Sequence, residues 1–249
     1  MISGRPEIHI KDILFIRQHP RHLGRNACFR KPLHSALRSR GATTHYAGHN
    51  ITFLVPGYGK RQRLPHPEII GKLNSGQITD IVDIGGGGAL DPALKRGDLI
   101  LSAGDIPFDT LQPVSVKRRP EMPRIVQEIA RRRQRRFFEG NILTSHEIIA
   151  ARKKRAEVHE KTTCAVVQME HCWFLRALEN IMGAASFRRL YVTHIEIVSD
   201  VVPRRDSVMQ HFLEICHGVD YCFLRNQQSI GTIKRDFLEL WLKRESSDD

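Results

Sequence analysis

The chain has 249 residues, of which 41% are apolar, so it can bury an ordinary core in one large α/β domain or in two smaller ones. No apolar run approaches the length of a membrane span and no signal-peptide core stands at the start, so we expect a soluble protein. The five cysteines are scattered, odd in number and without metal-ligand spacing, which predicts reduced thiols in a cytoplasmic protein.

The formal net charge of +12 is concentrated in part of the chain. Residues 115–137 hold nine Lys or Arg and two Glu, which gives +7, whereas residues 13–67 hold no Asp or Glu. Such a basic segment can bind nucleic acid or a phosphorylated ligand, or it can be the solvated face of a helix. The apolar stripe of Ile125, Ile129 and Phe137 favours the helix face. The lack of interleaved aromatic residues disfavours binding of single-stranded nucleic acid.

Hydrophobic periodicity predicts strands that alternate with helices along the chain. The expected strands cover residues 13–16, 51–55, 78–84, 99–103, 140–144, 163–167 and 191–198. The expected helices cover residues 33–40, 68–73, 124–137, 145–158, 170–181, 207–217 and 230–243. This order predicts an α/β fold: a three-layer sandwich in which helices flank a central mixed β-sheet on both faces. Ligands of such sheets bind where strands end.

The glycine run at residues 85–88 is the most informative stretch. It follows an apolar strand and precedes a Leu-Asp-Pro sequence at residues 90–92. Glycine has no Cβ, so the run predicts a sharp turn that comes close to an anion or a sugar. A dinucleotide-binding turn is disfavoured, because the sequence after the run does not complete the Gly-x-Gly-x-x-Gly pattern that opens a helix.

Five segments stand in an order that is typical of one enzyme family. They are Gly57-Tyr-Gly-Lys60, Gly85-Gly-Gly-Gly-Ala-Leu-Asp-Pro-x-Leu-x-x-Gly-Asp98, Gly140-x-Ile-x-Thr-Ser145, Val166-Val-Gln-Met-Glu170 and Ile197-Val-Ser-Asp200. Over roughly residues 50–220 the chain therefore resembles the nucleoside phosphorylase and nucleosidase superfamily. The resemblance implies one phosphorylase-like domain over residues 1–249, of which residues 1–50 match poorly.

The resemblance implies roles for five residues in cleavage of an N-glycosidic bond. Asp200 would protonate or hydrogen-bond the leaving base, with Ser199 beside it. Glu170 would accept hydrogen bonds from two ribose hydroxyls, and Met169 would pack against the sugar. Ile148 falls where a base stacks. From the spacing alone, a helix N-cap is the favoured interpretation of Asp200, and an exposed first-turn residue is the alternative for Glu170. For Ile148, ordinary helix packing is as expected as a contact with the base.

The attacking group separates phosphorolysis from hydrolysis. Arg17 and Arg21 lie in a basic loop after the first strand, and they suit a phosphate because the guanidinium fork matches two oxygens. Gly86 also falls in the phosphate-binding stretch, although family members that use phosphate carry a hydroxyl there. The loops that line the site would include Gly57, Gly85 and Gly87. The sequence favours phosphorolysis weakly, and a hydrolytic nucleosidase is the close alternative.

The expected partner is a nucleoside or nucleotide, in particular one with a purine base, with inorganic phosphate as co-substrate of a phosphorolytic reaction. No resident cofactor and no membrane contact are expected. No metal ion is expected either, because the thirteen histidines show no paired ligand spacing with carboxylates. The resemblance also implies a homo-oligomer. The remaining alternative is an inactive or nucleic-acid-binding basic protein on the same fold.

Overall fold

A computed structural model describes residues 12–16, 42–46, 49–54, 65–205 and 227–245, together with residues 207, 209, 212 and 213. In these parts of the chain, no helix is both long and apolar enough to span a bilayer. The central element is one mixed β-sheet, and its strands are β1 (Asp12–Ile16), β2 (Ala42–Tyr46), β3 (His49–Leu54), β4 (Ile78–Ala89), β5 (Leu99–Pro107), β6 (Phe137–Thr144), β7 (Val166–Gln168) and β8 (Tyr191–Asp200).

The strand β4 organises the sheet. The strand order is β2-β3-β1-β4-β7-β6-β5-β8, and β4 also pairs with β8. The first part of β4 runs parallel to β1, most of its length runs parallel to β8, and its last two residues pair antiparallel with β7. The five strands β4, β7, β6, β5 and β8 therefore close on themselves, while β1, β3 and β2 extend the sheet on the other side.

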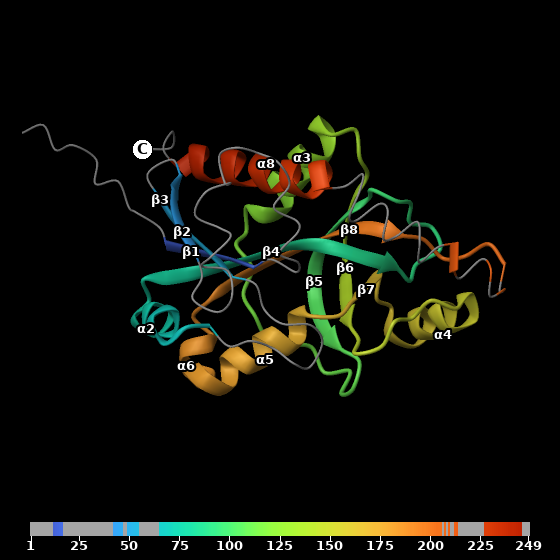
Figure 1. The fold of residues 1–249 in the computed structure, drawn as a ribbon, viewed down its shortest axis with the longest axis horizontal. Helices are drawn as coiled ribbons and strands as arrows, with labels where there is room; N and C mark the ends of the chain where they lie inside the picture. Colours follow the sequence, from blue (N-terminus) through green and yellow to red (C-terminus); the bar gives the residue numbers. More distant parts are fainter. Residues whose placement is uncertain are drawn as a thin grey trace, which may run out of the picture.

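Helices cover both faces of the sheet, as Figure 1 shows. The bounds of the helices are α2 (Pro67–Ser75), α3 (Met122–Arg132), α4 (Arg152–Thr162), α5 (His171–Met182), α6 (Ala184–Phe187) and α8 (Gln227–Glu245). The helices α3 and α8 lie on one face, α2, α5 and α6 lie on the other, and α4 lies beside β6 and β7 (Figure 1). This arrangement confirms the predicted three-layer α/β sandwich with a mixed sheet.

The alternation of side chains along β1 explains why two helical layers are needed. Ile13 and Phe15 are buried in a core with α3 and α8, whereas Leu14 is buried in a second core with α2 and α5. Successive side chains of a strand point to opposite faces, so an apolar run such as β1 must be covered on both sides. In the first core, the Phe237 ring of α8 meets the Phe15 ring edge-on, with centroids 6.4 Å apart.

The glycine run is a strand and not the expected turn. Residues 85–88 continue β4 and pair with residues 196–200 of β8, so their backbone groups are used in the sheet. The chain turns after Ala89 instead, in the segment that contains the Leu-Asp-Pro sequence. The prediction was wrong because it considered the conformational freedom of glycine and not the two neighbouring strands, whose pairing overrides local preference.

Two expected helices have different limits in the structure. Residues 145–151 are not helical, and the Ser145 hydroxyl accepts a hydrogen bond from the Glu147 amide in a local turn before α4 begins at Arg152. The arginine-rich helix α3 ends at Arg132, and Gln134 adopts a φ of 52°, which breaks the helix before β6 starts. The helix expected at 33–40 and most of that at 207–217 lie outside the described residues.

The packing of α8 predicts a large effect of one core substitution. Phe237 is fully buried, so Phe237→Ala should lower the free energy of unfolding by about 3–5 kcal/mol through lost burial and a residual cavity. Phe212 is 60% exposed, so the chemically identical change Phe212→Ala should stay within about 0.5 kcal/mol of the unmodified protein. Urea unfolding of both variants tests this, and equal losses would contradict the described packing of α8.

Candidate functional site

The candidate site lies at the end of β4, where this strand pairs with both β7 and β8. In the sheet register, Gly88 lies opposite Val167 of β7 on one edge and opposite Asp200 of β8 on the other. Glu170 follows β7 by two residues and immediately precedes α5. The structure therefore places the two carboxylates that the sequence singles out on elements flanking the same glycine stretch.

Both carboxylate oxygens of Asp200 accept hydrogen bonds within the protein. One oxygen, Oδ2, pairs with the guanidinium of Arg155 from α4, and the other, Oδ1, accepts the Ser199 hydroxyl at 2.8 Å. Arg155 is itself buried, and it also donates to the carbonyl oxygens of Ala89 at 3.0 Å and Ile149 at 2.8 Å. Asp200 is thus held at the end of β8 as a paired carboxylate and not as the free helix N-cap that was the alternative.

The missing side chains of two glycines leave room for the carboxylates. A Cβ on Gly88 would lie 2.9 Å and 3.2 Å from the two carboxylate oxygens of Asp200. A Cβ on Gly87 would lie 3.4 Å from Oε2 of Glu196 and 3.2 Å from the carbonyl oxygen of Val167. Contacts below 3.4 Å are tight for a real side chain, so these positions need glycine because of close approach and not because of an unusual φ.

Glu170 is buried, which excludes the alternative of an exposed first-turn glutamate. The side chain is 7% exposed, and its Oε2 accepts the backbone N–H of Met169 at 3.2 Å. Burial, followed by the negative charges of Glu196 and Asp83, raises the pKa of the Glu170 carboxyl to about 8. The carboxyl therefore carries a proton over much of the neutral range, and it lies at the amino end of α5.

The other predicted site residues fall into three groups. Gly86 within the glycine stretch and Met169 after β7 are partly exposed, and Ser199, Gly85 and Gly87 are buried within the strands. Ile148 is 70% exposed in the loop before α4, which excludes ordinary helix packing. The neighbouring Ile149 carbonyl accepts from Arg155, so this loop lies near Asp200. Arg17, Arg21 and Gly57 lie outside the described residues.

Two groups of side chains with candidate roles in function are not predicted by the sequence patterns. Arg155 falls in the helix predicted over residues 145–158, and no local signal connects it with Asp200, which is 45 residues away in sequence. The second group is a chain of fully buried acids and imidazoles that links Asp83, His171, Asp105, His194 and Glu196. Its members come from β4, α5, β5 and β8, so their spacing in sequence gives no metal-ligand pattern.

The charges and hydrogen bonds among these buried side chains shift their pKa values. Burial opposes the ionisation of Asp83 and Asp105, but the hydrogen bonds and charges of the two histidines outweigh it, so the pKa of each carboxyl is lowered. Burial disfavours the charged imidazoles too. The negative charge of Asp105 and the hydrogen bond to Asp83 nevertheless raise the pKa of His171, and the charges and hydrogen bonds of Asp105 and Glu196 raise the pKa of His194 well above its ordinary value.

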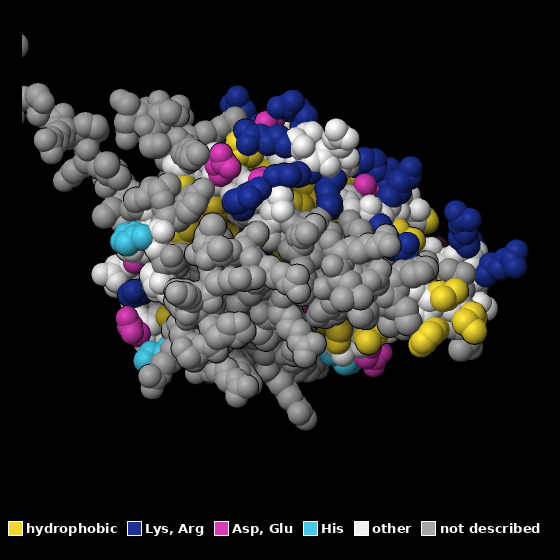
Figure 2. All heavy atoms as spheres, turned by 45° about the horizontal axis from the view of Figure 1, so that its top comes forward, with side chains coloured by type: hydrophobic (Ala, Val, Ile, Leu, Met, Phe, Trp, Pro, Cys, Tyr) yellow, Lys and Arg dark blue, Asp and Glu magenta, His cyan; other side chains and the backbone are white. Residues whose placement is uncertain are grey.

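The basic segment is largely paired with acids of the same chain. Arg131 and Arg132 both bind Glu128, and the remaining pairs are Arg118–Glu139, Arg119–Asp80, Arg133–Asp236 and Arg136–Asp98. Figure 2 shows Asp and Glu side chains interspersed with Lys and Arg on this side of the molecule. These contacts agree with a solvated, ion-paired surface and reduce the charge that is available to a nucleic acid.

The comparisons with known proteins agree with this fold. No curated protein matches the sequence. The chain is similar in structure to the S-adenosylhomocysteine nucleosidase from Streptococcus pyogenes, with a TM-score of 0.66, 16% identity, and coverage of 94% of this chain and 99% of that chain. It is also similar to a putative 5′-methylthioadenosine/S-adenosylhomocysteine nucleosidase from Borrelia burgdorferi bound to adenine, with a TM-score of 0.65, 15% identity and coverage of 92% and 99%.

A third similar structure is the futalosine hydrolase of Helicobacter pylori, with a TM-score of 0.62, 10% identity, and coverage of 92% of this chain and 98% of that chain. At these identities the three structures establish the fold and not the activity. Residues 29–179, which are more than half of the sequence and include the glycine stretch and Glu170, match the Phosphorylase superfamily. The chain therefore belongs to the phosphorylase superfamily.

Proposed function

We propose that this protein cleaves the N-glycosidic bond of a purine nucleoside by hydrolysis. The observation that carries the proposal is the position of Glu170 and Asp200 on either side of the glycine stretch of β4 in a phosphorylase-superfamily chain. The bond between the sugar carbon C1′ and the base nitrogen breaks, the oxygen of water bonds to C1′, and the proton that water releases balances the charge of the departing base.

Each side of the proposed site has one task in this reaction. The sugar acquires positive charge as the bond breaks, and the Glu170 carboxyl would bind its hydroxyls while Met169 packs against the ring. The base acquires negative charge, and Asp200 would hydrogen-bond or protonate it. Ile148, exposed on the loop next to the Arg155–Asp200 pair, offers an apolar surface for the base.

The residues around the glycine stretch support water over phosphate as the attacking group. Gly86 supplies no hydroxyl to bind a phosphate dianion. Arg155, the cation described beside Gly88, is engaged by Asp200 and by two carbonyl oxygens. The predicted phosphate ligands Arg17 and Arg21 lie outside the described residues. We therefore replace the weak preference of the sequence for phosphorolysis with hydrolysis.

Arg155 sets a condition on the proposed reaction. A guanidinium keeps its protons and stabilises a carboxylate, so Asp200 cannot act as an acid while both its oxygens are engaged as described. The base would have to displace the Ser199 or the Arg155 contact. The absence of a resident cofactor, the single domain and the homo-oligomeric state stay predictions.

A nucleoside panel tests the proposed reaction. The purified protein should release free base from at least one purine nucleoside in buffer without phosphate, and the second product should be the free sugar. The panel includes 5′-methylthioadenosine, S-adenosylhomocysteine and futalosine, the compounds after which the three similar enzymes are named. Chromatography of both products distinguishes the reactions: release that requires phosphate and yields a sugar 1-phosphate refutes hydrolysis, and no release under either condition refutes both.

The substitution Asp200→Asn tests the base side of the site. It keeps the shape of the side chain but removes the negative charge and the acid, so kcat should fall by roughly 10²–10⁴-fold. The thermal transition should fall as well, because the buried Arg155 loses its negatively charged partner and keeps only neutral oxygen acceptors, so kcat is measured at a temperature where the variant is folded. Asp91→Asn is the matched control, since the Asp91 carboxylate only caps the Ala93 amide in the turn after β4. An unchanged kcat in Asp200→Asn would remove this residue from the mechanism.

The substitution Gly88→Ala tests the close approach between β4 and β8. The added Cβ must displace the Asp200 carboxylate, which lies 2.9 Å away, and a misplaced carboxylate should lower kcat by roughly 10–100-fold. Gly71→Ala, on α2 with no atom within 4 Å of the new Cβ, should leave kcat unchanged. Steady-state kinetics of both variants checks this, and equal rates would show that Asp200 does not need its described position.

A further inference from the structure

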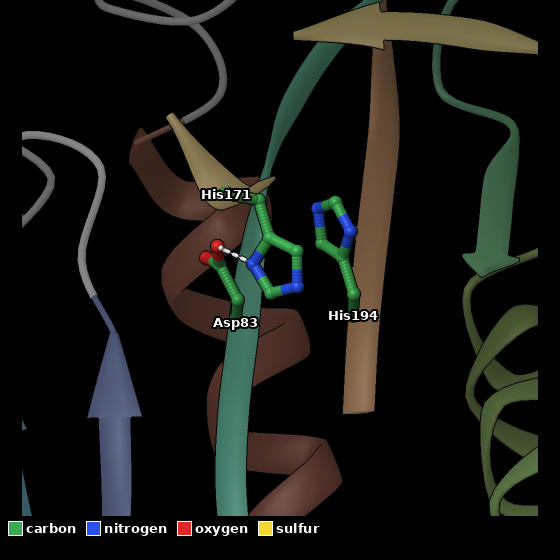
Figure 3. A group of neighbouring side chains, drawn as sticks. All are labelled: Asp83, His171 and His194. Carbon is green, nitrogen blue, oxygen red and sulfur yellow. Dashed lines mark hydrogen bonds and ion pairs between the residues drawn. The ribbon is translucent and has the colours of Figure 1, made fainter. Parts of the chain in front are cut away.

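The core behind the proposed site contains an unusual concentration of charge. Asp83, His171 and His194 come from β4, the start of α5 and β8, and Figure 3 shows them side by side. His171 Nδ1 lies 2.8 Å from Asp83 Oδ2, and the two imidazole rings stack with centroids 3.8 Å apart. His194 Nδ1 lies 2.7 Å from Asp105 and its Nε2 lies 2.8 Å from Glu196. All five residues are at most 2% exposed.

Three acidic side chains of the cluster are buried close together. Asp83, Asp105 and Glu196 enter the core from β4, β5 and β8, and Lys234 of α8 attracts Asp83. Buried acidic side chains are retained in proteins where they are paired or where they coordinate a metal ion. A divalent cation is therefore a ligand that this cluster can accept.

Two buried atoms of the cluster lack hydrogen-bond partners. They are Oδ1 of Asp83 and Nε2 of His171. The nearest acid to His171 Nε2 is Asp105 Oδ2 at 3.6 Å, which is too long for a hydrogen bond. Buried polar atoms are almost always satisfied in proteins, so two unsatisfied atoms in one cluster indicate a ligand that accepts their lone pairs.

We propose that Asp83, His171 and His194 form a binding site for a divalent transition-metal ion such as Zn²⁺. Their ligand atoms all lie within 4.8 Å of one another. Ligands at about 2.1 Å from a tetrahedral ion are about 3.4 Å apart, so binding requires a contraction of up to about 1.4 Å between ligand atoms. One imidazole must also rotate about its Cβ–Cγ bond, because two stacked rings cannot direct their nitrogen lone pairs at the same ion.

The surrounding acids suit this assignment. When one nitrogen of an imidazole binds a metal ion, the N–H of the other nitrogen almost always donates to a carboxylate or carbonyl, which fixes the ring and raises its basicity. Asp105 and Glu196 both face His194, so either can hold this ring after the other nitrogen has turned to the ion. Two imidazoles and one carboxylate favour Zn²⁺ or another first-row ion over Ca²⁺ or Mg²⁺, which prefer oxygen ligands only. His171 directly follows Glu170 in the chain, so the ion would lie close to the proposed sugar-binding residue.

Metal content of the unmodified protein tests the proposal directly. Protein made without a metal-affinity tag is stripped with a chelator, incubated with Zn²⁺ and desalted, and should retain roughly one ion per chain by elemental analysis. Co²⁺ in place of Zn²⁺ should give visible d–d absorption without the thiolate charge-transfer band that ligation by the buried Cys164 or Cys172 would produce. Folded protein that binds neither ion, or a strong thiolate band, would overturn the assignment.

Substitution of the ligands identifies the site. His171→Gln and His194→Gln should each raise the Kd for Zn²⁺ by roughly 100-fold or more. The matched control His159→Gln changes a histidine of α4 whose Nδ1 meets only the Cys164 carbonyl, and it should bind Zn²⁺ normally. If the histidine variants do not fold, Asp83→Asn replaces the third ligand with a side chain of the same size as Asp. Unchanged Zn²⁺ affinity in every folded ligand variant would refute the site, whatever the result of the nucleoside assays.

Discussion

Close packing of backbone at the end of β4 is the constraint on which the rest of the structure depends. Residues 85–88 pair with β8, and Gly88 also pairs with β7, so this strand joins the open part of the sheet to its closed part. A side chain at Gly87 or Gly88 would meet Glu196 or Asp200 at 3.4 Å or less. The glycines therefore serve two purposes: they allow the sheet to close and they leave space for carboxylates at the closure.

The closure also explains why so many acids are buried in one region. The strands β4, β5 and β8 converge there, and each contributes acidic side chains to the interior: Asp83, Asp105 and Glu196. Buried carboxylates destabilise a fold unless positive charge or hydrogen-bond donors compensate them. His171, His194 and Arg155 provide this compensation from α5, β8 and α4. The helices α4 and α5 therefore balance the charge of the buried acids together with β8, in addition to covering the sheet.

Local patterns in the sequence predict most of the fold and part of the candidate site. The alternation of apolar runs with helical periodicity predicts the layered sheet, and the Met-Glu and Ser-Asp pairs predict which strand ends carry carboxylates. The same patterns mistake the glycine run for a turn and residues 145–151 for a helix, because sheet pairing and loop contacts involve distant residues. The Arg155–Asp200 pair and the histidine cluster are non-local for the same reason, and only the folded chain brings their members together.

Arg155 connects the two sides of the proposed base-binding site into one structural unit. Its guanidinium binds the Asp200 carboxylate and the carbonyl oxygens of Ala89 and Ile149, so it contacts β8, the end of β4 and the loop that carries Ile148. Any movement that frees the carboxylate for a base must also alter the contact with this loop. The proposed base-binding surface and the proposed acid therefore cannot change independently, since one buried cation holds both.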